Sequence, residues 1–275
     1  MLVTGSDAVG TIGGGHLEWK AIEFARPNLV FVATPNNPTS NLVSLDRLEA
    51  LIEAAPEALV IVDEAYIDFA PRTQLHLRMK YPNVAVMRTL SKVGFASLRV
   101  GWLIGPAYLV REIDKTRQPY NLSVPSQRGA TFVLDELGPE VERMCAAIVA
   151  ERARLGEGLA GLGMKVTPSD ANFLWVETTR PAGEVYAQLK AQGVLVKSFH
   201  ERGGRLAHRL RITVGLPAEN DRLLPRVARA DAQVASVADD RRDRSSCPCG
   251  RAGNGLLYDP VHEIKERPVR RTRIF

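Results

Sequence analysis

The sequence predicts an α/β fold in which a mostly parallel sheet is followed by a smaller α+β part. Two continuous apolar runs, at residues 29–34 and 58–62, are typical of strands that are buried on both faces. The helix predicted between them begins at Ser44 and ends before Pro56, and its leucines recur at helical spacing. A strand, a helix and a second strand in this order form a right-handed crossover, so the two strands should be parallel.

The apolar runs farther along the chain first extend this pattern and then change it. We expect strands at residues 83–87 and 99–105, a helix at 107–116, and a long helical stretch from about 126 to 162 that is interrupted near Gly138. Beyond it the expected elements are shorter and mixed: strands at 172–176, 194–197 and 209–213, a helix at 182–192 and a last helix ending near 230. This pattern divides the chain into an atypical segment over 1–26, a partial large domain over 27–140, a small α+β domain over 141–230 and a basic tail over 231–275 that we expect to be disordered.

The composition is that of a globular protein. Hydrophobic residues make up 45% of the 275 residues and charged residues 24%, which excludes a fully disordered, collagen-like or coiled-coil chain. No run of about eighteen apolar residues and no signal-peptide pattern occurs, so we expect no membrane span and a cytoplasmic protein. The three cysteines have the wrong number and spacing for a disulfide framework or a metal knuckle, and we expect no metal site.

Most of the net charge of +5 comes from the carboxy-terminal end. Residues 265–275 alone carry five basic side chains and one acidic side chain. Charge confined to a tail is typical of a solvated segment and says little about the folded body. Nucleic-acid binding through this tail is an alternative that predicts salt-dependent binding lost on deletion of residues 231–275.

Polar side chains follow three of the predicted strands. Ligands of doubly wound sheets bind outside the carboxyl ends of parallel strands, so these side chains should form one site. They are Asn36-Asn37-Pro38-Thr39 after the first strand, Asp63-Glu64-Ala65-Tyr66 after the second, and Arg88-Thr89-Leu90-Ser91-Lys92 with Arg99 after the third.

These residue types match what pyridoxal 5'-phosphate needs from a protein. The cofactor takes an amine for a Schiff base, an acid beside its ring nitrogen, donors to its phenolic oxygen and a phosphate site. Each residue alone is as readily a turn or surface residue, and it is the three sets in order that predict a shared site. In this assignment Lys92 supplies the amine, Asp63 the acid, Asn37 and Tyr66 the phenolic-oxygen donors, and Thr89, Ser91 and Arg99 the phosphate site.

The same motifs carry a family resemblance. Thr34-Pro-Asn-Asn-Pro-Thr39, Val62-Asp-Glu-Ala-Tyr66 and Arg88-Thr-Leu-Ser-Lys92 resemble fold-type-I aminotransferases, and among them histidinol-phosphate aminotransferases. The resemblance continues through Asn172-Phe-Leu174 and Leu210-Arg-Ile-Thr-Val-Gly215 and covers about residues 27–230. It implies that Lys92 carries the cofactor, that Arg211 binds the acidic group of the substrate, and that the protein is a homodimer.

Three departures from the family pattern stand out. Ser40 replaces the glycine that usually ends the first motif, which should strain a turn that requires positive φ. The step from Lys92 to Arg99 is one residue shorter than in many relatives, which implies a tighter loop. Only 26 residues precede Pro27, so we expect an amino-terminally shortened or rearranged member of the family, and residues 9–25 resemble instead a stretch of the xanthine dehydrogenase accessory factor family, which we interpret as a turn and a helix.

The resemblance implies transamination between small amino and keto acids. The implied pair is histidinol phosphate with 2-oxoglutarate, giving imidazole acetol phosphate and glutamate in histidine biosynthesis. Lys92 would move protons and Tyr66 and Asp63 would assist at the cofactor. An amino-acid-phosphate decarboxylase, another amino acid transaminase and a non-catalytic remnant are the alternatives, because the same constellation supports several reactions.

Overall fold

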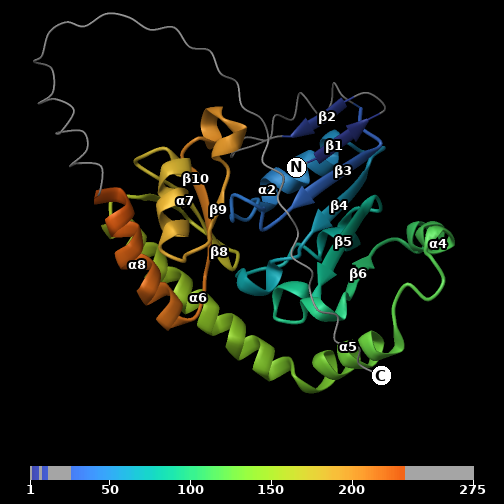
Figure 1. The fold of residues 1–275 in the computed structure, drawn as a ribbon. Helices are drawn as coiled ribbons and strands as arrows, with labels where there is room; N and C mark the ends of the chain where they lie inside the picture. The colour runs from blue at the N-terminus through green and yellow to red at the C-terminus, as the bar shows by residue number, and fades with distance from the viewer. Residues whose placement is uncertain (1, 6–7, 12–25, 233–275) are drawn as a thin grey trace, which may run out of the picture. The chain divides into compact units, whose positions relative to one another are not determined.

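The first sheet has six strands in the order β2-β1-β3-β4-β5-β6 (Figure 1). A computed structural model describes residues 2–5, 8–11 and 26–232, and its side chains over 26–230. β3, β4 and β5 run parallel, whereas β6 and the β1–β2 hairpin are antiparallel to their neighbours. The strands are β1 (Leu2–Gly5), β2 (Ala8–Thr11), β3 (Leu29–Ala33), β4 (Leu59–Asp63), β5 (Val84–Thr89) and β6 (Gly101–Ile104).

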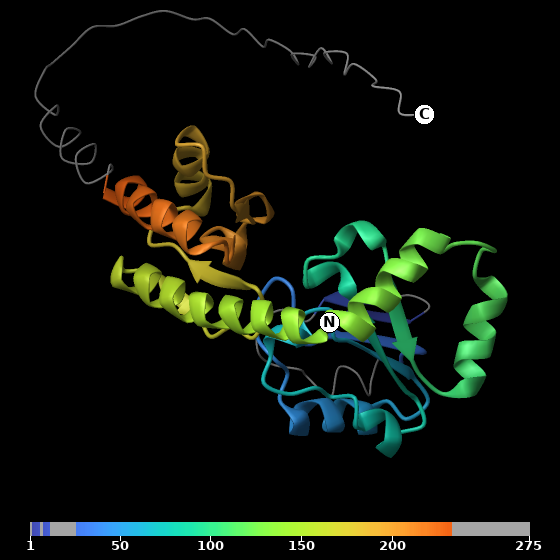
Figure 2. The ribbon, with the colours of Figure 1, turned by 90° about the horizontal axis from the view of Figure 1, so that it is seen from below.

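One face of this sheet packs against α2 (Leu45–Ala54). Val60, Val62, Val84 and Val86 alternate along β4 and β5 and form a buried cluster with the leucines of α2. Figure 2 shows α2 on one side of the sheet and the long helix α6 on the other. Side chains of opposite parity along β4 and β5 therefore face away from α2.

The other helices of this region differ in how much of their surface they bury. α4 exposes side chains along its whole length, whereas α5 buries Ala130 and Val133 against the segments after β4 and β5. The predicted interruption near Gly138 is confirmed, because α5 ends one residue before Leu137 and α6 begins one residue after it. These elements are α3 (Leu77–Lys80), α4 (Ala107–Thr116), α5 (Val124–Glu136), α6 (Gly138–Gly161) and the short 3-10 helices η1 (Ile67–Phe69), η2 (Leu90–Lys92) and η3 (Ala96–Leu98).

A second sheet has four antiparallel strands in the order β7-β8-β10-β9. Its core consists of Val176, Leu210 and Ile212 with apolar residues of α6, α7 and α8. The elements are β7 (Lys165–Thr167), β8 (Phe173–Glu177), α7 (Ala182–Ala191), β9 (Lys197–Ser198), η4 (His200–Arg202), η5 (Gly204–Leu206), β10 (Arg209–Thr213) and α8 (Pro217–Ala232).

Two expectations need correction. No strand was expected before residue 13, yet β1 and β2 pair there, because four-residue strands interrupted by glycine are too short to show a pattern. The strand expected at 194–197 is displaced to β9, since only Lys197 and Ser198 pair with β10. Leu195 is 76% exposed, so this apolar run is not the buried strand it resembles.

Some expectations lie outside the described residues. They are the turn and helix within residues 12–25 and the tail beyond residue 232. Among the helices that the structure describes, none has the length and apolar character needed to cross a membrane.

Candidate active site

The three predicted sets of polar residues lie at one edge of the first sheet. β3, β4 and β5 are parallel and in register, with Ala33 opposite Asp63 and Asp63 opposite Met87. Their carboxyl ends therefore meet at the same edge. Asp63 is the last residue of β4, Thr89 is the last residue of β5, and Lys92 ends the 3-10 turn that follows.

The Lys92 amine lies over the aromatic ring of Tyr66. Its Nζ is 5.1 Å from the ring centroid, within the range of a cation–π contact. Tyr66 is buried and Lys92 is half-buried. Lys92, whose amine could bind a ligand covalently, therefore contacts Tyr66, which follows the neighbouring strand β4.

The Asp63 carboxylate is fixed by the backbone beside it. Its Oδ1 accepts a hydrogen bond from the Ala65 N–H at 2.9 Å, and its main-chain carbonyl accepts from the Thr34 N–H at 2.9 Å. The side chain is half-buried at the strand end. Asp63 Oδ2 accepts no hydrogen bond from the residues that the structure describes, so it can receive one from a ligand.

Thr89 and Ser91 form a hydroxyl pair where η2 begins. The two hydroxyl oxygens are 2.9 Å apart, and Thr89 Oγ1 also accepts from the Ser91 N–H at 3.1 Å and lies 2.9 Å from the Val100 carbonyl oxygen. The contact with Val100 places the Thr89 hydroxyl beside the residue that directly follows Arg99. Arg99 is exposed and has a left-handed backbone with φ of 58°. A non-glycine residue held in this region is a strained position of the kind found at ligand sites.

Arg211 reaches the first motif from the second sheet. Its Nη1 donates a 2.7 Å hydrogen bond to Oδ1 of Asn37, a residue 174 positions away in sequence. The amide nitrogen of Asn37 stays available as a donor. Arg211 Nε is buried and has no hydrogen-bond partner among the described residues, so the guanidinium retains unused donor capacity.

Phe173 connects Arg211 with Tyr66. The Arg211 guanidinium lies 5.1 Å from the Phe173 ring centroid, and the Tyr66 ring meets the Phe173 ring edge-on at 5.1 Å. The prediction missed the role of Phe173, although the residue stands in the Asn172-Phe-Leu174 motif. A chain of contacts thus runs from Lys92 through Tyr66 and Phe173 to Arg211 and Asn37.

Arg152 of α6 holds the backbone of the two segments that carry this aromatic contact. Its Nη1 donates to the Phe69 carbonyl at 3.1 Å and to the Ala171 carbonyl at 2.8 Å. Burial lowers the pKa of the Arg152 guanidinium. Nothing in the local sequence pattern marks this arginine among the others of the helix, because its role depends on the carbonyls it meets.

Ser40 has the strained backbone that its position predicts. Its φ is 66°, its side chain is fully buried, and its hydroxyl has no hydrogen-bond partner among the described residues. Two backbone bonds of 2.7 Å hold it in place: its N–H donates to the Asn36 carbonyl, and its carbonyl accepts from the Asp170 N–H. The loop that carries Asn37 is therefore tied to the segment before β8 in spite of the strain.

Ser40→Gly is expected to stabilise the protein by about 1–2 kcal/mol. The change removes the left-handed penalty and an unsatisfied buried hydroxyl, and the greater freedom of glycine in the unfolded chain offsets part of this gain. Urea denaturation should show a higher midpoint with an unchanged slope. Ser40→Ala is the matched control, because it removes only the hydroxyl. A Ser40→Gly protein no more stable than Ser40→Ala would contradict the strain.

Cys145 is buried beneath the Tyr66 segment and takes no part in the site. Burial, with a smaller contribution from the Asp68 carboxylate, raises the pKa of the Cys145 thiol to about 11. Because the thiolate is the reactive form, iodoacetamide at pH 8 should modify Cys145 at least about 100-fold more slowly in the native protein than in urea. The native rate should rise as the pH approaches 11. Mass spectrometry of the Cys145 peptide measures both rates, and equal rates would refute the assignment.

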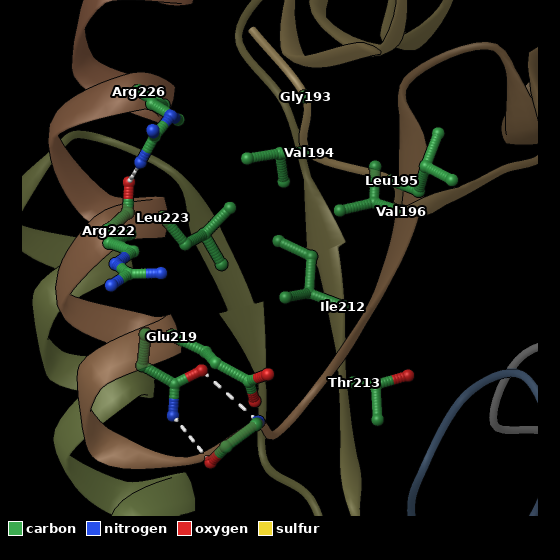
Figure 3. A pocket seen from close by; sticks show the side chains of 12 residues that line it. Gly193, Val194, Leu195, Val196, Ile212, Thr213, Glu219, Arg222, Leu223 and Arg226 are labelled. Carbon is green, nitrogen blue, oxygen red and sulfur yellow. Dashed lines mark hydrogen bonds between the residues drawn. The ribbon is translucent and has the colours of Figure 1, made fainter.

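A cavity of about 420 Å³ lies apart from this constellation (Figure 3). It opens between β10, the segment before β9 and the first turns of α8, where Arg222 and Arg226 lie near Leu223. None of the predicted site residues lines it. The predicted site residues at the strand ends of the first sheet are therefore separate from this cavity.

Comparison with known proteins decides the family. Residues 15–227 match the model of the family described as aminotransferase class I and II. The chain is a member of this family. The matched residues include every predicted site residue, from Asn37 to Arg211. The resemblance of residues 9–25 to the accessory factor stays a prediction, and residues 15–25 of that stretch fall within the aminotransferase match.

Curated relatives of this aminotransferase-family chain are histidinol-phosphate aminotransferases. It is 44% identical to histidinol-phosphate aminotransferase 2 of Nitrosococcus oceani over 200 residues, which are 72% of this chain and 55% of that protein. It is also 44% identical to the enzyme of Methylibium petroleiphilum over 207 residues, 74% of this chain and 55% of the relative. The chain thus spans about half the length of these relatives.

Solved structures confirm the expected fold class. Histidinol-phosphate aminotransferase of Sinorhizobium meliloti, in complex with pyridoxal-5'-phosphate, matches with a TM-score of 0.71 at 25% identity, over 78% of this chain and 60% of that one. A decarboxylase of Sulfurospirillum multivorans matches with a TM-score of 0.69 at 24% identity, over 76% and 63% of the two chains. The second likeness shows the shared fold alone.

Proposed function

We propose that this aminotransferase-family chain catalyses transamination between histidinol phosphate and 2-oxoglutarate with pyridoxal 5'-phosphate as cofactor. The observation that carries the proposal is the meeting of Lys92, Asp63 and Tyr66 at the adjoining ends of two parallel strands. The identity of 44% to curated histidinol-phosphate aminotransferases supports the choice of substrates. We place this biosynthetic reaction in the cytoplasm.

The residues present fit the cofactor. The free oxygen of Asp63 suits a protonated ring nitrogen, the Asn37 amide nitrogen and the Tyr66 hydroxyl suit the phenolic oxygen, and the Thr89–Ser91 hydroxyls with Arg99 suit the phosphate. Lys92 supplies the amine for covalent attachment. The unpartnered Nε of Arg211 is the donor that an acidic substrate group would satisfy.

When bound, the cofactor supplies an electron sink for the bond that is broken at the substrate α-carbon. The protein's own residues then do the rest. Lys92 Nζ takes the proton from the α-carbon of the amino donor and, in the second half of the reaction, delivers a proton to the α-carbon of the keto acid. Asp63 keeps a proton on the ring nitrogen, and Arg211 orients the substrate through its acidic group.

We also propose that the active form is a homodimer. Several large apolar side chains on α4, on α5 and in the segment that joins them are more than 40% exposed. Such exposure is typical of a surface that another chain covers. They are Tyr108, Val110, Ile113, Tyr120, Val124, Phe132 and Leu134. Sedimentation equilibrium should give twice the chain mass, and a monomer at micromolar concentration would contradict this part of the proposal.

Glutamate formation tests the proposed reaction. The cofactor-loaded protein is incubated with histidinol phosphate and 2-oxoglutarate, and glutamate is measured against a reaction that lacks histidinol phosphate. We expect glutamate only in the complete reaction. Release of carbon dioxide from a phosphorylated amino acid would favour the decarboxylase alternative. A folded protein that binds no cofactor would favour the non-catalytic alternative.

A further inference from the structure

A buried ion pair joins the ends of β4 and β5 next to the predicted site. Arg88 Nη2 lies 2.8 Å from Glu64 Oε2, and Arg88 Nε donates to the same oxygen at 2.9 Å. The Glu64 side chain has no exposed surface, and the Arg88 side chain is 24% exposed. Two donors on one carboxylate oxygen make this a well-oriented contact.

Each member of the pair is the immediate neighbour in sequence of a predicted cofactor-binding residue. Glu64 follows Asp63 directly after β4, and Arg88 precedes Thr89 at the end of β5. Arg88 and Thr89 line a common cavity of about 250 Å³ with Asp68 and residues of α5 and α6. The ion pair therefore lies directly beside the residues that we assign to the cofactor.

Glu64 is saturated with hydrogen bonds. Its carboxylate accepts from the Thr73 hydroxyl at 2.8 and 2.9 Å and from the Gln74 N–H at 2.5 Å. Its own N–H donates to the Met87 carbonyl at 2.9 Å, which extends the pairing of β4 with β5 beyond the last strand residue. Arg88 Nη2 adds a 2.7 Å contact to the Thr73 hydroxyl. These contacts fix the backbone directly after Asp63 relative to Met87 and Arg88, the two residues before Thr89.

Stability alone does not account for such a pair. Removing two charges from water has a large cost, and an apolar pair of similar volume is often at least as stable. A carboxylate and a guanidinium joined by two hydrogen bonds hold the two strand ends at one defined spacing and orientation. Apolar side chains do not impose such a geometry.

We propose that Glu64 and Arg88 are positioning residues, which set Asp63 relative to Thr89 and Lys92 and so determine how tightly the site holds pyridoxal 5'-phosphate. This inference rests on the proposed function. It goes further by assigning cofactor affinity to two residues outside the predicted set of cofactor-binding residues.

The test separates positioning from stability. Glu64→Gln leaves Arg88 without its counter-charge and is expected to lower both stability and affinity. In the double variant Glu64→Gln with Arg88→Met, neither charge remains and the new amide oxygen can still accept from the Gln74 N–H, so the thermal midpoint should return toward that of the wild-type chain. Pyridoxal 5'-phosphate is titrated into each protein at a temperature where circular dichroism shows it to be fully folded, and binding is followed by absorbance.

We expect the double variant to bind the cofactor at least about tenfold more weakly than the wild-type chain, a change equivalent to about 1.4 kcal/mol. Glu177→Gln is the matched control, because its ion pair with Arg209 is also 2.8 Å long but joins two strands of the other sheet. It should bind as the wild-type chain does.

The outcomes separate the two proposals. If the wild-type chain and the double variant bind with equal affinity, the pair has only a structural role and this inference is overturned while the proposed function stands. If the folded wild-type chain binds no pyridoxal 5'-phosphate, the proposed function fails and this inference fails with it. A weaker double variant beside an unchanged Glu177→Gln supports positioning.

Discussion

Lys92→Ala is expected to lower the rate of transamination by about 10²–10⁴-fold or more, because it removes both the covalent attachment and the group that moves the proton. The Tyr66 ring and the Asp63 carboxylate stay in place, so the variant should still fold and bind the cofactor without a covalent bond. Steady-state formation of glutamate measures the loss. The covalent absorbance band of the bound cofactor should disappear with it.

Lys190→Ala is the matched control for this prediction. Lys190 is an exposed lysine of α7, away from the predicted site residues. Its removal should leave activity within about twofold of the wild-type chain, since surface substitutions rarely perturb a protein by more than about 0.5 kcal/mol. A Lys92→Ala protein as active as the control would refute the assignment of Lys92.

Arg211→Lys is expected to lower kcat/KM by about 100-fold, mainly through a higher KM. Lysine keeps the positive charge but loses the planar fork that can hold an acidic group with two hydrogen bonds, and it loses the stacking on Phe173. It also releases Asn37, whose Oδ1 accepts the 2.7 Å bond from Arg211. The KM for the amino donor should therefore rise more than kcat falls.

Arg209→Lys serves as the control on the same strand. Arg209 stands two residues earlier, so it has the same parity along β10, and it lies over the Trp175 ring at 5.8 Å as Arg211 lies over Phe173. Its partner, however, is Glu177 and not a predicted site residue. Equal losses in the two variants would mean that Arg211 contributes to folding and not to substrate binding.

Local pattern was sufficient for several elements of the fold. The helix expected at 107–116 and the strand expected at 209–213 have the predicted bounds, because their apolar periodicity and flanking prolines or glycines act over a few residues. The parallel order of β3 and β4 followed from the single helix between them. Strands of four residues, such as β1 and β2, carry too little periodicity to be recognised.

The residue types at the site were also predictable, but their contacts were not. Polar side chains follow β3, β4 and β5, and this local pattern predicts a ligand site at the carboxyl ends of the parallel strands. The bond between Asn37 and Arg211 joins residues 174 positions apart, and it exists only because the two sheets come together there. The Glu64–Arg88 pair likewise depends on the register of two strands, which periodicity alone does not set.

Ser40 shows where a local departure from pattern has a measurable consequence. A serine was expected to strain a turn that favours glycine, and its φ of 66° places it in the left-handed region. The buried Ser40 hydroxyl, which has no hydrogen-bond partner among the described residues, further lowers the free energy of unfolding, and the sequence alone did not predict this. The stability gain expected for Ser40→Gly therefore comes from two separate causes.

Reductive trapping of the cofactor tests the central proposal most directly. The wild-type chain is loaded with pyridoxal 5'-phosphate, treated with borohydride and digested, and the modified peptide is identified by mass spectrometry. We expect one modified residue, Lys92, at near-stoichiometric yield. A folded protein that carries no label, or a label spread over exposed lysines with Lys92 unmodified, would contradict it.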